Sequence, residues 1–164
     1  MRGHLLSTLW ASATLVLLIA CGGASTSKAP AAAGTGTCVN AKASHKAYVV
    51  VQHGSGATVQ RCVGFDAQQE PGPDLMKQSG IEMQTQQSSY GTAVCQVDNE
   101  PAQFSECFPK NQPYWALFIG KPDGSWSVSE VGIDQVKLND GEALGWAYRQ
   151  QTQGSPSPPP APKR

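Results

Sequence analysis

The sequence predicts a mainly β domain with one short helix, an α+β fold held together by two disulfides. Short segments rich in β-branched and aromatic residues alternate with turns built from Gly, Pro and Asn, as is typical of strands. One segment carries helix start and stop signals, and four cysteines lie within the folded part. That part is expected to span residues 38–150, which is enough for a modest hydrophobic core.

The charge balance limits the classes of partner. The 164 residues include 12 basic and 12 acidic side chains, so the formal net charge is 0. A nucleic-acid binder normally carries a surplus of basic residues that attracts phosphates. We therefore expect no nucleic-acid partner. The length also predicts one domain rather than two.

Residues 1–20 are predicted to be a signal peptide rather than part of the fold. Arg2 and His4 form a basic start, and residues 9–20 are an apolar run that is too short to span a bilayer. Residues 18–22, LIACG, resemble the lipobox of bacterial lipoproteins. This resemblance implies cleavage before Cys21 and acyl chains on its thiol and its new amino group. The alternative is an ordinary secretory signal that happens to precede a cysteine.

Two acyl chains are enough to anchor a protein stably. The resemblance therefore implies that the lipid bilayer is a partner and that the protein is extracytoplasmic, on the cell membrane or, in a Gram-negative cell, on the outer membrane. Residues 21–37 are rich in Gly, Ser, Ala and Thr and are expected to form a flexible tether.

The other end of the chain, residues 151–164, reads QTQGSPSPPPAPKR and is expected to be a disordered, solvated tail. The alternatives are a segment that threads the cell wall or a ligand for a proline-binding module.

The first half of the domain is expected to contain four strands and the helix. The helix, at residues 74–79, begins after Pro73 and ends before Gly80. Strands are expected at residues 47–52, 57–63, 81–84 and 92–97.

The second half is expected to add three strands. Residues 114–119, YWALFI, are continuously apolar, which is typical of a strand buried on both faces. Residues 125–130 alternate between apolar and polar side chains after the Pro-Asp-Gly turn at 122–124. After the Asn-Asp-Gly turn at 139–141, residues 142–148 close the domain.

Four cysteines remain if Cys21 carries lipid, and an exported chain encounters an oxidising compartment. Of the three possible pairings, we prefer Cys38–Cys62 with Cys95–Cys107, because both close short loops. A zinc site is disfavoured because no two cysteines are as close as Cys-x₂₋₄-Cys.

No catalytic motif is evident in the sequence. It contains no Gly-x-Ser-x-Gly elbow and no phosphate-binding loop. His45 and His53 flank one predicted strand and are expected to be solvent-exposed turn residues. We therefore assign no catalytic residue and no certain cofactor, and we expect that the protein is not an enzyme.

Aromatic residues gather in the second half and are candidates for a ligand-binding face. The alternative is that some of them, Trp115 and Trp146 above all, belong to the core. Tyr114 and Trp115 are adjacent and must point to opposite faces of a sheet. The candidate ligand-binding residues are Tyr114, Trp115, Phe118, Trp126 and Trp146.

A series of motifs stands in fixed order within residues 47–148: YWALF at 114–118, PDG at 122–124, SEVGI at 129–133, LNDGE at 138–142 and GWAY at 145–148. This series resembles the C-terminal domain of transcobalamins and intrinsic factor, which also occurs as a standalone bacterial extracellular module. The resemblance implies a small β-grasp-like domain that supports ligand binding, with cobalamin as the ligand in eukaryotic members.

The chain departs from that family in two places. The eukaryotic carriers enclose the corrinoid between this domain and a helical barrel, which has no counterpart here, and Glu100 stands where the family has a turn glycine. Two functions remain open. The protein is either a surface module that captures a small ligand, with a corrinoid as the candidate, and presents it to a transporter, or a structural adaptor that docks a partner protein.

Overall fold

The computed structural model describes residues 37–89 and 91–164, which belong to one compact unit of residues 32–164. The predicted signal peptide, the lipidation site at Cys21 and residues 21–36 of the predicted tether lie outside the described residues. Within the described ranges, no helix has the length and apolar character needed to cross a bilayer.

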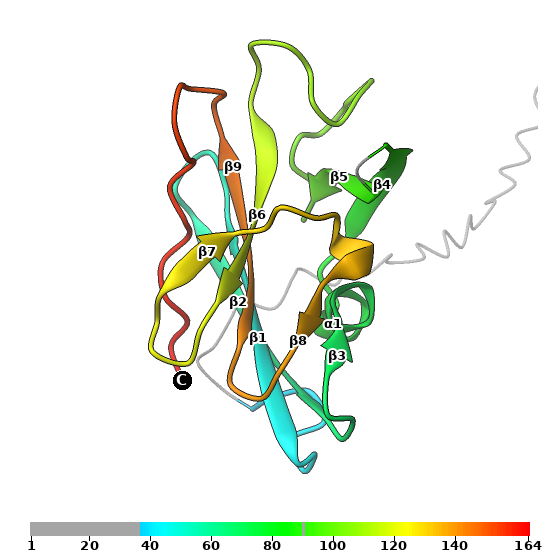
Figure 1. Ribbon diagram of the computed structural model, residues 1–164, viewed down its shortest axis with the longest axis vertical. Coiled ribbons are helices and arrows are strands. Elements are labelled where there is room, and N and C mark those ends of the chain that lie inside the picture. Colours follow the sequence, from blue (N-terminus) through cyan, green and yellow to red (C-terminus); the bar gives the residue numbers. More distant parts are fainter. Residues whose placement is uncertain (1–36, 90) are drawn as a thin grey trace, which may run out of the picture. The chain divides into compact units, whose positions relative to one another are not determined.

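A five-stranded sheet forms the centre of the domain (Figure 1). The first two strands form a hairpin, and the last strand of the chain inserts between the first strand and β6. It runs parallel to β1 and antiparallel to β6, which is the β-grasp arrangement that we predicted. In spatial order the strands are β2 (Thr58–Phe65), β1 (His45–Gln52), β9 (Ala143–Arg149), β6 (Tyr114–Gly120) and β7 (Trp126–Val128).

The remaining elements pack on one face of this sheet, which we call the inner face. Helix α1 (Gly72–Ser79) contacts β1 and β2, and a second hairpin of β4 (Met83–Ser88) and β5 (Gly91–Val97) lies beyond it (Figure 1). Short strands β3 (Glu70–Pro71) and β8 (Lys137–Leu138) pair with each other, and a 3₁₀ turn, η1 (Ile133–Gln135), precedes β8.

Helix α1 has the ends that its sequence predicts. Pro73 lies in its first turn, where the missing N–H costs nothing, and Asp74 interacts favourably with the helix dipole. The helix stops at Gly80, whose φ of 72° is left-handed and suits glycine. Leu75 and Met76 are fully buried and fix the helix on the sheet.

The core lies between the inner face and these elements. Alternate residues of each strand point into it, so that Val49 and Val51 of β1 and Trp146 of β9 meet Leu75 of α1 and Val97 of β5. Fully burying an aliphatic side chain of this size contributes about 1.5–3 kcal/mol. The core is therefore the main source of stability for the domain.

Both predicted disulfides are present, Cys38–Cys62 and Cys95–Cys107, with Cα atoms 4.5 Å and 4.1 Å apart. The first fastens the start of the described chain to β2, and the second fastens the loop after β5 to that strand. Structural disulfides are typical of proteins outside the cytoplasm. The structure thus supports an extracytoplasmic location.

The C-terminal segment is not the disordered tail that we predicted. Residues 151–164 cross the outer face of the sheet, where Pro159 and Pro162 are buried and the Arg149 side chain donates a hydrogen bond to Ser157 O at 3.1 Å. Proline has little backbone freedom to lose, so ordering this segment costs less entropy than ordering a Gly/Ser chain. The prediction rested on composition alone, which does not show that the folded sheet has an apolar outer face for this segment to cover.

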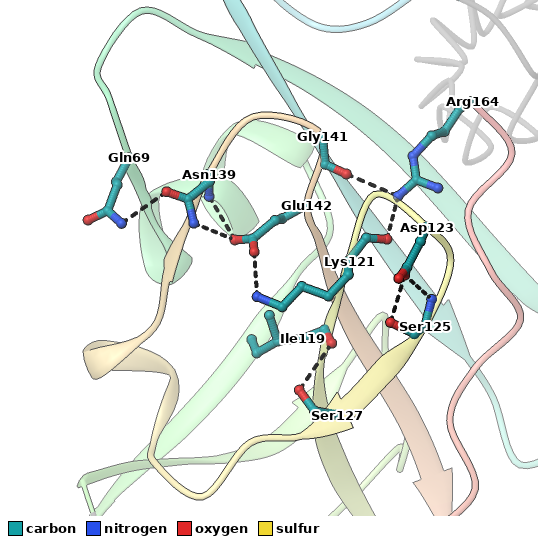
Figure 2. A network of polar contacts seen from close by, with 10 residues as sticks. All are labelled: Gln69, Ile119, Lys121, Asp123, Ser125, Ser127, Asn139, Gly141, Glu142 and Arg164. Carbon is teal, nitrogen blue, oxygen red and sulfur yellow. Dashed lines mark hydrogen bonds and ion pairs between the residues drawn. The ribbon is translucent and has the colours of Figure 1, made fainter.

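A buried carboxylate organises the turn between β8 and β9 (Figure 2). The Glu142 side chain is 7% exposed and accepts hydrogen bonds from Lys121 Nζ at 2.7 Å and from Asn139 N at 2.9 Å. Burial works to raise the pKa of Glu142, but these donors together outweigh it and lower the pKa below its ordinary value.

Replacing Glu142 with Gln is expected to lower the free energy of unfolding by about 1.5–3 kcal/mol, the usual worth of hydrogen bonds to a charged group. Because the pKa of Glu142 is lower in the folded than in the unfolded chain, this contribution is present above the unfolded pKa and is lost as pH falls through the folded pKa. Urea unfolding of Glu142→Gln and wild type across pH 3–7 measures it. An equal loss in the control Glu82→Gln, at an exposed position, would contradict the assignment.

Candidate functional site

A cavity of about 390 Å³ lies beside the long loop between β5 and β6. Tyr114 begins β6 and Tyr148 lies near the end of β9, so the neighbouring ends of two paired strands form one wall. The loop forms the rest. Its apolar lining residues are Pro101, Phe104, Pro109 and Pro113, and its polar ones are Gln103, Ser105, Glu106 and Gln112.

The loop contains almost no regular structure but is fastened at several points. The Cys95–Cys107 disulfide, which also lines the cavity, joins it to β5. The Gln96 side chain donates to Pro101 O at 2.6 Å, and Gln151 Nε2 donates to Pro109 O at 2.8 Å. These contacts hold the loop in place, so that the cavity is largely preformed.

The loop begins with a tight turn after β5. Val97 and Glu100 exchange backbone hydrogen bonds of 3.0 Å in both directions, which makes Asp98 and Asn99 the central residues. Their φ angles of 48° and 66° are left-handed, a conformation that Asp and Asn tolerate better than other residues with side chains. The turn therefore needs no glycine, and position 100 can hold a residue whose side chain reaches His53.

Glu100 takes part in a cluster of polar side chains around His53. Its Oε2 lies 2.8 Å from His53 Nδ1, and Asp98 Oδ2 lies 3.2 Å from His53 Nε2. The side chain of His53 is only 16% exposed, which corrects our expectation of a solvent-exposed turn residue. The cluster joins the β1–β2 turn to the turn after β5, two segments that are distant in sequence.

Aromatic rings connect this cluster to the cavity. The ring centroid of Trp115 lies 6.0 Å from that of His53 and 5.0 Å from that of Tyr148. The Trp115 Nε1–H group donates a hydrogen bond to Glu100 O at 2.7 Å. Burial and the negative charge of Glu100 raise the pKa of Tyr148, so its hydroxyl stays neutral at physiological pH. Tyr148 thus offers the cavity a neutral hydrogen-bonding group.

The structure separates the five predicted ligand-binding residues. Tyr114 lines the cavity, and its neighbour Trp115 points to the opposite, inner face, as strand geometry predicts. Trp146 also lies in the core and is 2% exposed. Phe118 and Trp126 pack together on the outer face, with their ring centroids 6.5 Å apart.

Most of the residues that line the cavity are not among the predicted ligand-binding residues. These predictions include neither Tyr148 nor the proline-rich loop at residues 101–113. The loop carries a signal that would have indicated structure, since three prolines and a bridged cysteine stand beside aromatic residues. His53 and Glu100 carry no such local signal because they meet only in the folded chain.

A second hollow, of about 740 Å³, is larger but more open to solvent. Small and polar residues such as Asn40, Ala43 and Asp66 line it, with Phe65 as the one aromatic residue among its lining. Ligand sites usually combine enclosure with aromatic and apolar walls. The smaller cavity is the more enclosed of the two and is lined by three aromatic residues, so we treat it as the candidate site.

Residues 37–89 and 91–164 contain no group of three or more His, Cys, Asp and Glu side chains arranged to hold a metal ion. The His53 cluster cannot serve, because its two carboxylates contact different ring nitrogens and leave no shared point at which ligands converge.

Comparison with known proteins shows a likeness in fold. No family profile and no curated protein matches the chain. Among solved structures, a protein from Ruminococcus gnavus ATCC 29149, titled a "putative metal binding protein", is similar with a TM-score of 0.51 and 19% sequence identity. The match covers 66% of this chain and 99% of the other. At this identity the likeness concerns the fold alone.

Removing the disulfide that borders the cavity is expected to destabilise the domain and open the site. Closing a loop of 12 residues is worth about 3 kcal/mol by the chain-entropy argument. Thermal unfolding of Cys95→Ser/Cys107→Ser measures this loss, and limited proteolysis should cut residues 101–113 faster than in wild type. In the control Cys38→Ser/Cys62→Ser, the loss of stability should be similar without faster cleavage of that loop. Equal cleavage in both variants would contradict a specific role for Cys95–Cys107.

Proposed function

We propose that the protein is a lipid-anchored surface module that binds a small organic ligand in the cavity between Tyr114, Tyr148 and the loop at residues 101–113. The observation that supports this proposal most directly is a cavity of about 390 Å³ whose lining includes three aromatic residues and three prolines. The Cys95–Cys107 disulfide holds this lining in place. The volume of the cavity falls within the usual range for ligand sites, about 300–1,000 Å³. Rigid walls reduce the ordering cost of binding.

The lining favours a flat ligand with polar edges. Tyr114 and Phe104 supply ring faces for stacking, while Gln103 and Gln112 supply amide donors and acceptors. A corrinoid stays the candidate suggested by the family resemblance. A corrin ring is too large to be enclosed here, so this chain would hold one edge of it before passing it to a transporter.

Ligand binding can be tested with residues 32–164, which form one compact unit. Titration with cyanocobalamin and cobinamide by calorimetry, and with a set of planar heterocycles by ligand-observed NMR, is expected to give binding that Tyr114→Ala weakens at least tenfold. Tyr48→Ala, which removes a tyrosine that does not line the cavity, should leave the affinity unchanged. Absence of binding at millimolar ligand, or equal effects of the two variants, would refute the proposal.

One observation favours the second function, docking of a partner protein. Phe104 and Phe108, both on the cavity loop, are 38% and 54% exposed. Exposed aromatic residues on a fixed loop are typical anchors of protein interfaces. Crosslinking on cells, with wild type and Phe108→Ser compared, distinguishes the functions, since an adaptor would lose a stoichiometric partner while ligand affinity stayed the same.

The proposed anchor depends on Cys21, which lies outside the described residues. Cys21→Ala is expected to move the protein from the membrane fraction to the soluble fraction, because stable anchoring needs the acyl chains. Fractionation followed by immunoblotting measures this. Cys38→Ala, which changes a bridged cysteine, is the control and should stay with the membrane. A Cys21→Ala protein that remained membrane-bound would contradict lipid anchoring.

A further inference from the structure

The outer face of the five-stranded sheet is apolar, although helix α1 and the smaller strands lie on the inner face (Figure 1). Val50, Phe118 and Ala147 point outward by strand alternation, yet they are only 1%, 1% and 0% exposed. The C-terminal segment, drawn in red in Figure 1, passes along this side of the molecule. It covers a surface that an unaccompanied sheet would expose to water.

The segment contacts the face with a period of three residues. Pro159 and Pro162 are buried and Pro156 is half-buried, whereas the residues between them are exposed. Three residues per turn is the period of the polyproline II helix, which proline-rich sequences favour. One edge of such a helix therefore lies on the sheet, and the other two edges face solvent.

Glycines make room for this edge. A Cβ atom added to Gly145 of β9 would lie 3.0 Å from Pro159 Cγ and 2.6 Å from the Trp126 ring. A Cβ atom added to Gly120 of β6 would lie 2.7 Å from the same ring. The two glycines, on adjacent strands, thus leave space in which Trp126 and Pro159 lie together against the sheet.

Polar contacts fix the backbone of the segment at both ends. The Arg149 side chain donates to Ser157 O at 3.1 Å and to Pro158 O at 3.4 Å. Gln60 of β2 pairs with the backbone of Lys163 in both directions, donating to its carbonyl at 2.5 Å and accepting from its N–H at 2.8 Å. These sheet side chains bind main-chain atoms, which any segment of similar shape presents.

The Arg164 side chain is also held. Arg164 Nη2 donates to Lys121 O and to Gly141 O, each at 3.0 Å (Figure 2). The Arg164 guanidinium lies 5.4 Å from the Tyr48 ring centroid. Two carbonyl groups and a ring face thus form a receptor for a cation next to the buried prolines.

We propose that the outer face is a binding groove for proline-rich segments in polyproline II conformation that carry a basic residue two positions after their last proline, and that the chain's own segment 151–164 is its displaceable intramolecular occupant. The prolines at every third position fill the groove, and Arg149, Gln60 and the Arg164 receptor determine direction and register. A partner protein with such a segment binds when it replaces the tail.

The tail is suited to be displaced. Residues 150–155, which connect it to β9, are exposed and include Gly154 at a φ of 102°. A short tether of this kind keeps the tail at an effective concentration on the order of millimolar. An added proline-rich segment must therefore compete with the tail, and weakening the tail should reveal the groove.

The test uses the full chain with substitutions in the tail only. Pro159→Glu/Pro162→Glu changes the two buried prolines, and Pro158→Glu/Pro160→Glu, at exposed positions, is the matched control. A labelled peptide of residues 153–164 is expected to bind the first variant at least tenfold more tightly than the control or wild type, as measured by fluorescence anisotropy. A peptide with glutamate at 159 and 162 should bind none of them.

A second measurement on the wild-type chain covers the case in which the variant does not fold. The amide hydrogen of Lys163, which donates to Gln60 Oε1 in the docked tail, should exchange slowly with solvent, and at least tenfold faster when a tail peptide is added in millimolar excess, as measured by NMR hydrogen exchange. Equal exchange with and without peptide would overturn the proposal. A released variant that dimerised without binding the peptide would also overturn it, because the face would then belong to a second copy of the chain.

Discussion

The insertion of strand β9 between β1 and β6 is the interaction on which the rest of the domain depends. β9 pairs with β1 over five residues and with β6 over seven, and so joins the first and second halves of the chain. Alternate residues of β9 point to opposite faces of the sheet and pack on both of them. Trp146 completes the inner core, while Gly145 leaves space on the outer face for Trp126 and Pro159. Tyr148, near its end, reaches the cavity.

The two faces of the sheet are stabilised in different ways. The inner face is covered by a helix and a hairpin, whose apolar side chains form a continuous core. The outer face is covered by a segment without regular hydrogen bonding, which relies on proline rings and on side chains that bind its main chain. The first covering is integral to the fold. The second is held by side-chain contacts to its main chain, and in our proposal a similar segment of a partner protein replaces it.

The sequence was sufficient to predict the fold class, the helix and both disulfides because each has a local signal. Helix α1 is marked by Pro73 and Gly80, and the cysteine pairs close short loops. The site was less predictable. Tyr114 was named, but Trp115 and Trp146 belong to the core, and an aromatic residue gives no indication of its neighbours in the fold. His53 meets Glu100 only because two turns, 47 residues apart, lie together.

The order of the strands has a consequence for how the protein matures after export. Each disulfide joins cysteines 24 or 12 residues apart, and both lie before β9 in the chain. Oxidation can therefore be complete while the central position of the sheet is still vacant. The step that remains brings Ala143 beside Tyr48, a long-range closure of the kind that slows folding. Until β9 inserts, the outer face lacks Ala147 and Gly145, and Pro159 of the C-terminal segment lies against Gly145. The segment can therefore dock only after the sheet is complete.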